Sequence, residues 1–129
     1  MRLVFLVFAE AAEATDRGTI NITGCGDVYL PRQSPVLAEL VVVAQVEGTT
    51  SELGPHVLRV VVVDPDGQPI TTPLEEPFIL VRDARVLYRP VKFTYILRFH
   101  DLVFPAPGDY AAHVFVDDAN LGSALLYVR

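Results

Sequence analysis

The residues that could do chemistry are few in this sequence, and their spacing matches no known catalytic arrangement. The three histidines, His56, His100 and His113, form neither an HxH nor an HExxH motif. Ser123 follows a glycine but lacks the second glycine of a nucleophile elbow. Cys25 is the single cysteine, so the chain cannot build a disulfide or a thiolate cluster from it alone. We therefore expect no catalytic residues, no enzymatic activity and no cofactor.

Acidic residues gather in two predicted turns and give one candidate metal site. Asp64 and Asp66 lie in the segment Asp-Pro-Asp-Gly, and Asp117 and Asp118 lie in Asp-Asp-Ala-Asn. Their carboxylates would suit calcium if both turns lay at the same end of the fold. An EF-hand is excluded, because Pro69 stands where that loop needs glycine. Since Asp, Asn and Gly are also the ordinary residues of turns, a purely structural role is favoured, with calcium binding as the alternative.

A carbohydrate site is the other ligand-binding alternative. Sugars are usually recognised by aromatic rings that offer both an apolar face and a polar tip. The chain has no tryptophan, and only Tyr29 and Tyr88 lie near the ends of predicted strands. These two tyrosines are the candidates for such a site.

The composition is that of one folded, acidic domain. The 129 residues are 51% hydrophobic and 20% charged, and this length suits a single domain over residues 1–129. Sixteen acidic against ten basic residues give a formal net charge of −6. This charge repels a phosphate backbone and an anionic bilayer, so we expect neither nucleic acid nor a membrane as a partner.

The apolar N-terminal run, residues 3–9, imitates a secretion signal but is better explained as a strand. It is far shorter than the ~18 residues needed to span a bilayer. Glu10 and Glu13 also crowd the region where a signal would be cleaved. We expect a strand over residues 2–9 and a cytoplasmic protein, with secretion as the alternative.

Alternation of apolar and polar residues predicts that strands dominate the fold. The predicted strands cover residues 2–9, 19–30, 36–46, 56–64, 68–81, 91–99, 110–117 and 123–128. Three prolines confine the segment 68–81 to a sheet edge, because proline cannot donate to a strand ladder. The one helical candidate, residues 9–14, is too short to be stable alone. About eight strands joined by short turns are typical of a single antiparallel β-sandwich.

The same alternation predicts which side chains form the core. Residues 36–46 are expected to point their even-numbered side chains inward. The other predicted core residues are Leu58, Val60, Val62, Phe93, Tyr95, Leu97, Phe99, Tyr110, Val114, Val116, Leu126 and Val128.

Three segments carry a resemblance to known proteins. Residues 104–128 resemble the C-terminal hairpin of many immunoglobulin-like bacterial domains. Together with residues 16–24 and 58–67, they are similar to a family of small uncharacterised bacterial proteins of unknown function. The resemblance implies an immunoglobulin-like β-sandwich in a bacterial cytoplasm, and it implies no activity. The chain departs from the family pattern at Cys25 and Gly26, where bulky apolar residues are expected.

Several predicted strands are apolar on both faces, which indicates that something must cover the outer side. The outward-facing apolar residues of this kind include Val41, Val43, Val61, Leu125 and Tyr127. A strand that is apolar on both faces must be buried on both, and a chain with almost no helix has nothing of its own to do so. A second copy of the chain, forming a homodimer through these residues, is the expected cover, and another protein partner is possible. A wrongly assigned register or a valine-rich central strand would also explain the pattern.

These observations predict a non-enzymatic interaction or assembly module that self-associates. A calcium- or carbohydrate-binding β-sandwich that uses the acidic hairpin loops is the alternative.

Overall fold

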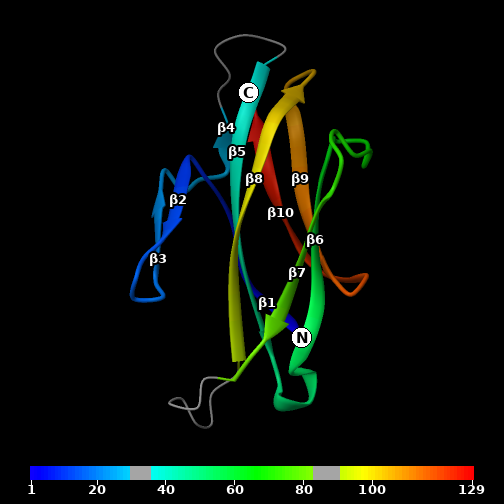
Figure 1. Ribbon diagram of the computed structural model, residues 1–129. Helices are drawn as coiled ribbons and strands as arrows, with labels where there is room; N and C mark the ends of the chain where they lie inside the picture. Colours follow the sequence, from blue (N-terminus) through cyan, green and yellow to red (C-terminus); the bar gives the residue numbers. More distant parts are fainter. Residues whose placement is uncertain (30–35, 83–90) are drawn as a thin grey trace.

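The computed structural model describes residues 1–29, 36–82 and 91–129 (Figure 1). Strands make up nearly all of the regular structure in these ranges, beside one short 3-10 helix, η1 (Thr50–Glu52). The strands are β1 (Arg2–Ala9), β2 (Ala11–Ala14), β3 (Ile20–Thr23), β4 (Val28–Tyr29), β5 (Val36–Gly48), β6 (Gly54–Val63), β7 (Leu74–Leu80), β8 (Val91–Phe104), β9 (Gly108–Val116) and β10 (Ala119–Val128).

Two sheets pack against each other. One sheet has three strands in the order β1-β5-β8, and all of its pairs are antiparallel. The other has five strands in the order β4-β10-β9-β6-β7, in which only the short pair between β4 and β10 is parallel. A separate hairpin of β2 and β3 lies beside the three-stranded sheet (Figure 1).

The strand order is that of an immunoglobulin-like domain. Immunoglobulin domains place strands A, B and E in one sheet and strands G, F and C in the other, with C′ added beside C in the variable type. The sheets β1-β5-β8 and β10-β9-β6-β7 have this order. Tyr110, near the start of β9, donates its hydroxyl to the backbone oxygen of Ala106 at 2.7 Å, which is the tyrosine corner of such folds. The prediction of an antiparallel, immunoglobulin-like β-sandwich is confirmed.

The core lies between the two sheets and consists of the alternate side chains of each long strand. Val42 and Ala44 of β5 face Val60 and Val114 of the other sheet in one buried cluster. Phe93 and Tyr95 are half-buried and pack against this cluster. The other predicted core residues of β6, β8, β9 and β10 all belong to it, so the predicted register of these strands is confirmed.

The number of strands differs from the expected eight for two reasons. The predicted strand over residues 19–30 is divided into β3 and β4, because Gly24 adopts a positive φ of 67° and turns the chain. Residues 9–14, judged too short for a stable helix and assigned to no strand, include strand β2 (Ala11–Ala14). Strand β7 lies at the edge of the five-stranded sheet, as its prolines predicted.

The hairpin of β2 and β3 covers the outer face of the three-stranded sheet. Ala12 and Ile20 pack on Val41 and Val43, whose side chains are 2% and 0% exposed. The Arg98 guanidinium fixes the hairpin by donating to the backbone oxygen of Ala12 at 2.7 Å. The prediction that Val41 and Val43 form part of an uncovered face is therefore wrong, because the chain supplies its own cover.

Candidate functional site

The outer face of the five-stranded sheet carries exposed apolar side chains, unlike the outer face of the three-stranded sheet, on which the β2–β3 hairpin packs. Its strands β6, β9 and β10 present Val61, His113 and Ser123 side by side, since these residues are paired across the sheet. Exposed apolar side chains extend over the same face: Ile79 is 64% exposed and Leu125 is 49% exposed. No described strand packs over this face as the β2–β3 hairpin does over the other.

A depression of about 430 Å³ lies on this face. Val61 and Val63 of β6 line its apolar part, and both are nearly buried, at 9% and 8% exposure. Pro69 and Pro73, from the segment that joins β6 to β7, line it from the edge of the sheet. The depression is thus apolar along β6 and is walled by a proline-containing loop.

Arg59 supplies the positive charge of this depression. Its guanidinium carbon lies 4.6 Å from the ring centroid of Phe115, the residue paired with it on β9. Stacking of this kind holds a guanidinium by the attraction between the cation and the aromatic face. The nearest carboxylate oxygen, Oδ1 of Asp118, is 4.0 Å away on a side chain that is 93% exposed, so it neutralises Arg59 weakly. Within the described residues the buried Nε of Arg59 has no hydrogen-bond partner.

Asn120 and His113 complete the polar part of the lining. The side-chain oxygen of Asn120 accepts the backbone N–H of Gly122 at 2.9 Å, which leaves the amide NH₂ as a donor. His113 makes no hydrogen bond to another described residue. Three side chains with N–H donors therefore meet beside an apolar surface.

His56 and Asp117 form a second polar cluster, at the other end of β6. His56 Nδ1 lies 2.5 Å from Asp117 Oδ2, and His56 Nε2 lies 2.5 Å from the backbone oxygen of Glu52. The hydrogen bond to Asp117, supported by the Glu52 carbonyl, raises the pKa of His56. The hydrogen bonds from His56 and from the Val57 N–H hold the pKa of Asp117 below its ordinary value.

This cluster resembles part of a catalytic triad but lacks what a catalytic base needs. Both nitrogens of His56 are occupied by acceptors, so neither is free to take a proton from a nucleophile. No described serine or cysteine bonds to the ring. The cluster fixes the turn between β9 and β10 to the start of β6, which is a structural role.

The four acidic turn residues do not form one site. Asp117 is bonded to the start of β6, whereas Asp64 follows the end of that strand, so the two turns lie at opposite ends of the sandwich (Figure 1). Asp64 Oδ1 accepts the backbone N–H groups of Asp66 and Gln68, both at 2.9 Å, and so closes its own turn. The described residues contain no group of three or more His, Cys, Asp or Glu side chains able to hold a metal. The arrangement that calcium would require, with Asp64, Asp66, Asp117 and Asp118 together, is contradicted.

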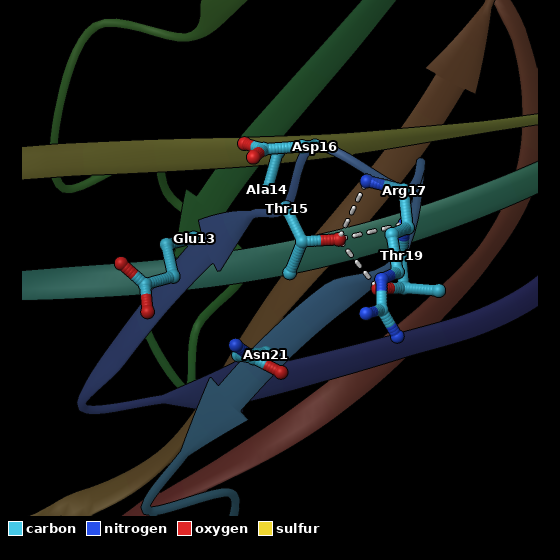
Figure 2. Close-up of a pocket in the computed structure, with 7 residues that line it drawn as sticks. All are labelled: Glu13, Ala14, Thr15, Asp16, Arg17, Thr19 and Asn21. Carbon is cyan, nitrogen blue, oxygen red and sulfur yellow. Dashed lines mark hydrogen bonds between the residues drawn. The ribbon is translucent and has the colours of Figure 1, made fainter.

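A second depression, of about 490 Å³, lies in the turn of the β2–β3 hairpin (Figure 2). Thr15 Oγ1 accepts the backbone N–H groups of Arg17 and Thr19 at 3.3 Å and bonds to the Thr19 hydroxyl at 2.6 Å. These contacts close the turn upon itself, as Figure 2 shows. The polar groups there serve the turn, and we assign no ligand to it.

The remaining predicted site residues are placed as follows. Tyr88 lies outside the described residues, and Tyr29 forms part of β4. Val61, Leu125 and Tyr127 belong to the five-stranded sheet, and Leu125 is the exposed one of the three. The sequence did not single out Arg59 or Phe115, because only the register of β6 and β9 brings them together.

Comparison with known proteins gives a family and several similar solved structures. Residues 4–129 match the model of a family described as "Family of unknown function (DUF6941)". No curated protein matches the chain. An immunoglobulin-like protein from Pseudomonas aeruginosa is similar at 19% identity, with 98% of each chain covered and a TM-score of 0.40. Alkylpurine DNA glycosylase AlkC from Pseudomonas fluorescens, bound to DNA containing an abasic site analogue, is similar at 17% identity, with a TM-score of 0.46. That match covers 80% of this chain and 28% of the glycosylase chain.

Proposed function

Since the chain belongs to this family of unknown function, we propose from its geometry that it is a non-enzymatic interaction module. It binds its partner through the outer face of the five-stranded sheet, and a second copy of the chain is that partner. Membership of the family confirms the resemblance seen in the sequence.

The observation that carries the proposal is the difference between the two outer faces. The β2–β3 hairpin buries Val41 and Val43 on one sheet, while Ile79 and Leu125 stay 64% and 49% exposed on the other. Val57, on β6 near the end that pairs with Ile79, is 43% exposed. Several exposed apolar side chains on one sheet face are a common feature of protein-binding surfaces.

A second copy is the simplest occupant, because one apolar face matches itself about a two-fold axis. The acidic charge of the chain, −6, opposes pairing at long range, so the apolar contact has to supply the attraction. Burial of two such faces would need to reach the ~1,200 Å² or more that stable interfaces bury.

Light scattering coupled to size-exclusion chromatography tests the proposal. We expect the wild-type chain at tens of micromolar to give the mass of two chains. Leu125→Glu and Ile79→Glu should each give the mass of one chain, because a charge in the contact is costly to bury.

Val103→Glu is the matched control, since Val103 is 38% exposed on β8 of the other sheet. This variant should keep the wild-type mass. A wild-type chain with the mass of a monomer at all concentrations tested would overturn the proposal of self-association.

A further inference from the structure

The depression beside Arg59 combines one permanent cation with an apolar surface. Val61, Val63 and the two prolines provide the apolar part, and Arg59, His113 and Asn120 provide donors. Ligand sites commonly have this mixture of apolar lining and a few convergent polar groups. At about 430 Å³, the depression is within the range of volumes that such sites show, roughly 300–1,000 Å³.

Arg59 is held in place, and no described carboxylate oxygen lies closer to it than 4.0 Å, although Glu75 is paired with it across β6 and β7. Phe115 supports the guanidinium from one side at 4.6 Å. Its closest carboxylate, that of Asp118, is 4.0 Å away and almost fully exposed. Arg129 makes an informative comparison, because it also lies over an aromatic ring, Tyr127, but has Asp109 at 3.3 Å.

The guanidinium nitrogens of Arg59 differ in their accessibility to a ligand. Nε is buried and has no acceptor among the described residues, whereas the Arg59 side chain as a whole is 32% exposed. The terminal Nη groups are therefore the donors that a ligand can reach, and paired guanidinium donors match the two oxygens of a carboxylate.

We propose that this depression binds a small carboxylic acid with a compact apolar body, such as an aryl or branched aliphatic acid. The carboxylate pairs with Arg59, with His113 and Asn120 as additional donors. The hydrocarbon part lies on Val61 and Val63 against Pro69 and Pro73. The inference goes beyond the proposed interaction with a second copy, because it assigns a ligand chemistry to one part of the face.

A small acid fits the lining better than phosphate does. Inorganic phosphate has no apolar part, so it would leave the surface of the two valines and two prolines without a contact. The one guanidinium of Arg59 balances the single negative charge of a carboxylate. The second charge of a phosphate dianion would be repelled by the acidic chain, whose net charge is −6.

Titration followed by ¹H–¹⁵N correlation spectra tests this inference. The probe is phenylacetate, and the matched neutral compound is phenylacetamide. We expect saturable shifts at the amides of residues 59–63 and 113–120 with phenylacetate. Phenylacetamide and inorganic phosphate should bind at least tenfold more weakly.

Arg59→Gln should weaken phenylacetate binding by about tenfold or more, because it removes the charge-assisted pair. Arg129→Gln should leave binding unchanged, since Arg129 does not line the depression. Equal binding of acid and amide, or unchanged binding in Arg59→Gln, would overturn the inference.

The same titration on Ile79→Glu separates this inference from the proposed function. Ile79 does not line the depression, so acid binding should persist in a variant that cannot self-associate. Failure of dimerisation with retained acid binding would reject the first proposal alone. Normal dimerisation of the wild type, together with no acid binding by the monomeric Ile79→Glu variant, would reject the second alone.

Discussion

At the scale of single residues, His56 shows how a side chain can join two distant segments. Its ring lies between the Asp117 carboxylate and the Glu52 carbonyl, neither of which can donate a hydrogen bond. Both ring nitrogens must therefore carry a proton when both bonds form, so the bonded ring is the imidazolium. This requirement is the physical reason why the pKa of His56 is raised.

The pair makes stability depend on pH in a defined direction. The pKa of His56 is raised in the folded chain. Its contribution to the free energy of unfolding is therefore complete below about pH 6.5, and it is lost as the pH rises through the pKa of the folded state. The pKa of Asp117 is lowered in the folded chain. Its contribution to the free energy of unfolding is therefore present above about pH 3.8, and it is lost as the pH falls through the pKa of the folded state. The Asp117 side chain is half exposed, so screening limits the pair to about 0.5–1 kcal/mol.

We expect His56→Gln to be less stable than wild type at pH 5.5, with a smaller difference at pH 9. Urea unfolding at both pH values measures the free energies of unfolding. His100→Gln is the control, because His100 is exposed and should show no such change. A difference between His56→Gln and wild type that is equal at both pH values would show that the ring acts by packing, for example against Phe78.

The sequence predicts the burial of a residue well where the alternation within one strand decides which way its side chain points. Leu97, Tyr110 and Val114 were assigned to the core from alternation alone, because a strand fixes the direction of each side chain. Asp117 was recognised only as a turn residue, since its partner His56 is 61 positions away. The Arg59–Phe115 contact was missed for the same reason: it depends on the register between two strands.

At the scale of elements, the β2–β3 hairpin is the part that the sequence predicted least well. Residues 9–14 are rich in alanine, which favours helix in isolation. Pairing of Ala12 with Ile22 and burial of Ala12 on the sheet override that preference. The turn depends on Gly18, whose φ of 77° suits glycine, and on the hydroxyl of Thr15.

The hairpin can be opened by one substitution at its contact with the sheet. Ile20 packs on Val41 and Val43, so Ile20→Asp should lift the hairpin and expose both valines. We expect a loss of about 2–3 kcal/mol in the free energy of unfolding and increased binding of the dye ANS.

Asn21→Asp is the matched control, because Asn21 lies on the same strand, is exposed and points to the face opposite Ile20. It should change stability by less than about 0.5 kcal/mol. Equal losses in the two variants would contradict the role assigned to the hairpin.

At the scale of the whole molecule, the two acidic turns lie at opposite ends of one strand. Val57, which bonds to Asp117, and Asp64 are seven residues apart on an extended chain, or ~20 Å. No single ion can bridge that distance. The sequence could not show this, because it does not reveal at which end of a sandwich each turn lies.

We therefore expect no effect of calcium on thermal stability. A site filled to a hundred times its dissociation constant would add ~2.7 kcal/mol, which would raise the melting temperature by several degrees. Melting curves with millimolar calcium and with a chelator should coincide. A shift that is abolished by Asp117→Asn would contradict this expectation.

No helix in the described residues is long and apolar enough to cross a membrane.

The hairpin also limits how many copies could join. A sandwich with two open apolar faces can stack without end, because each added copy presents a new face to the next. Here one face is closed by the chain itself, with Val43 fully buried beneath Ala12 and Ile20. The proposed association through the other sheet face would then end at a closed pair. The hairpin from Ala11 to Thr23 would thus leave a pair of such chains without a second apolar sheet face on which further copies could stack.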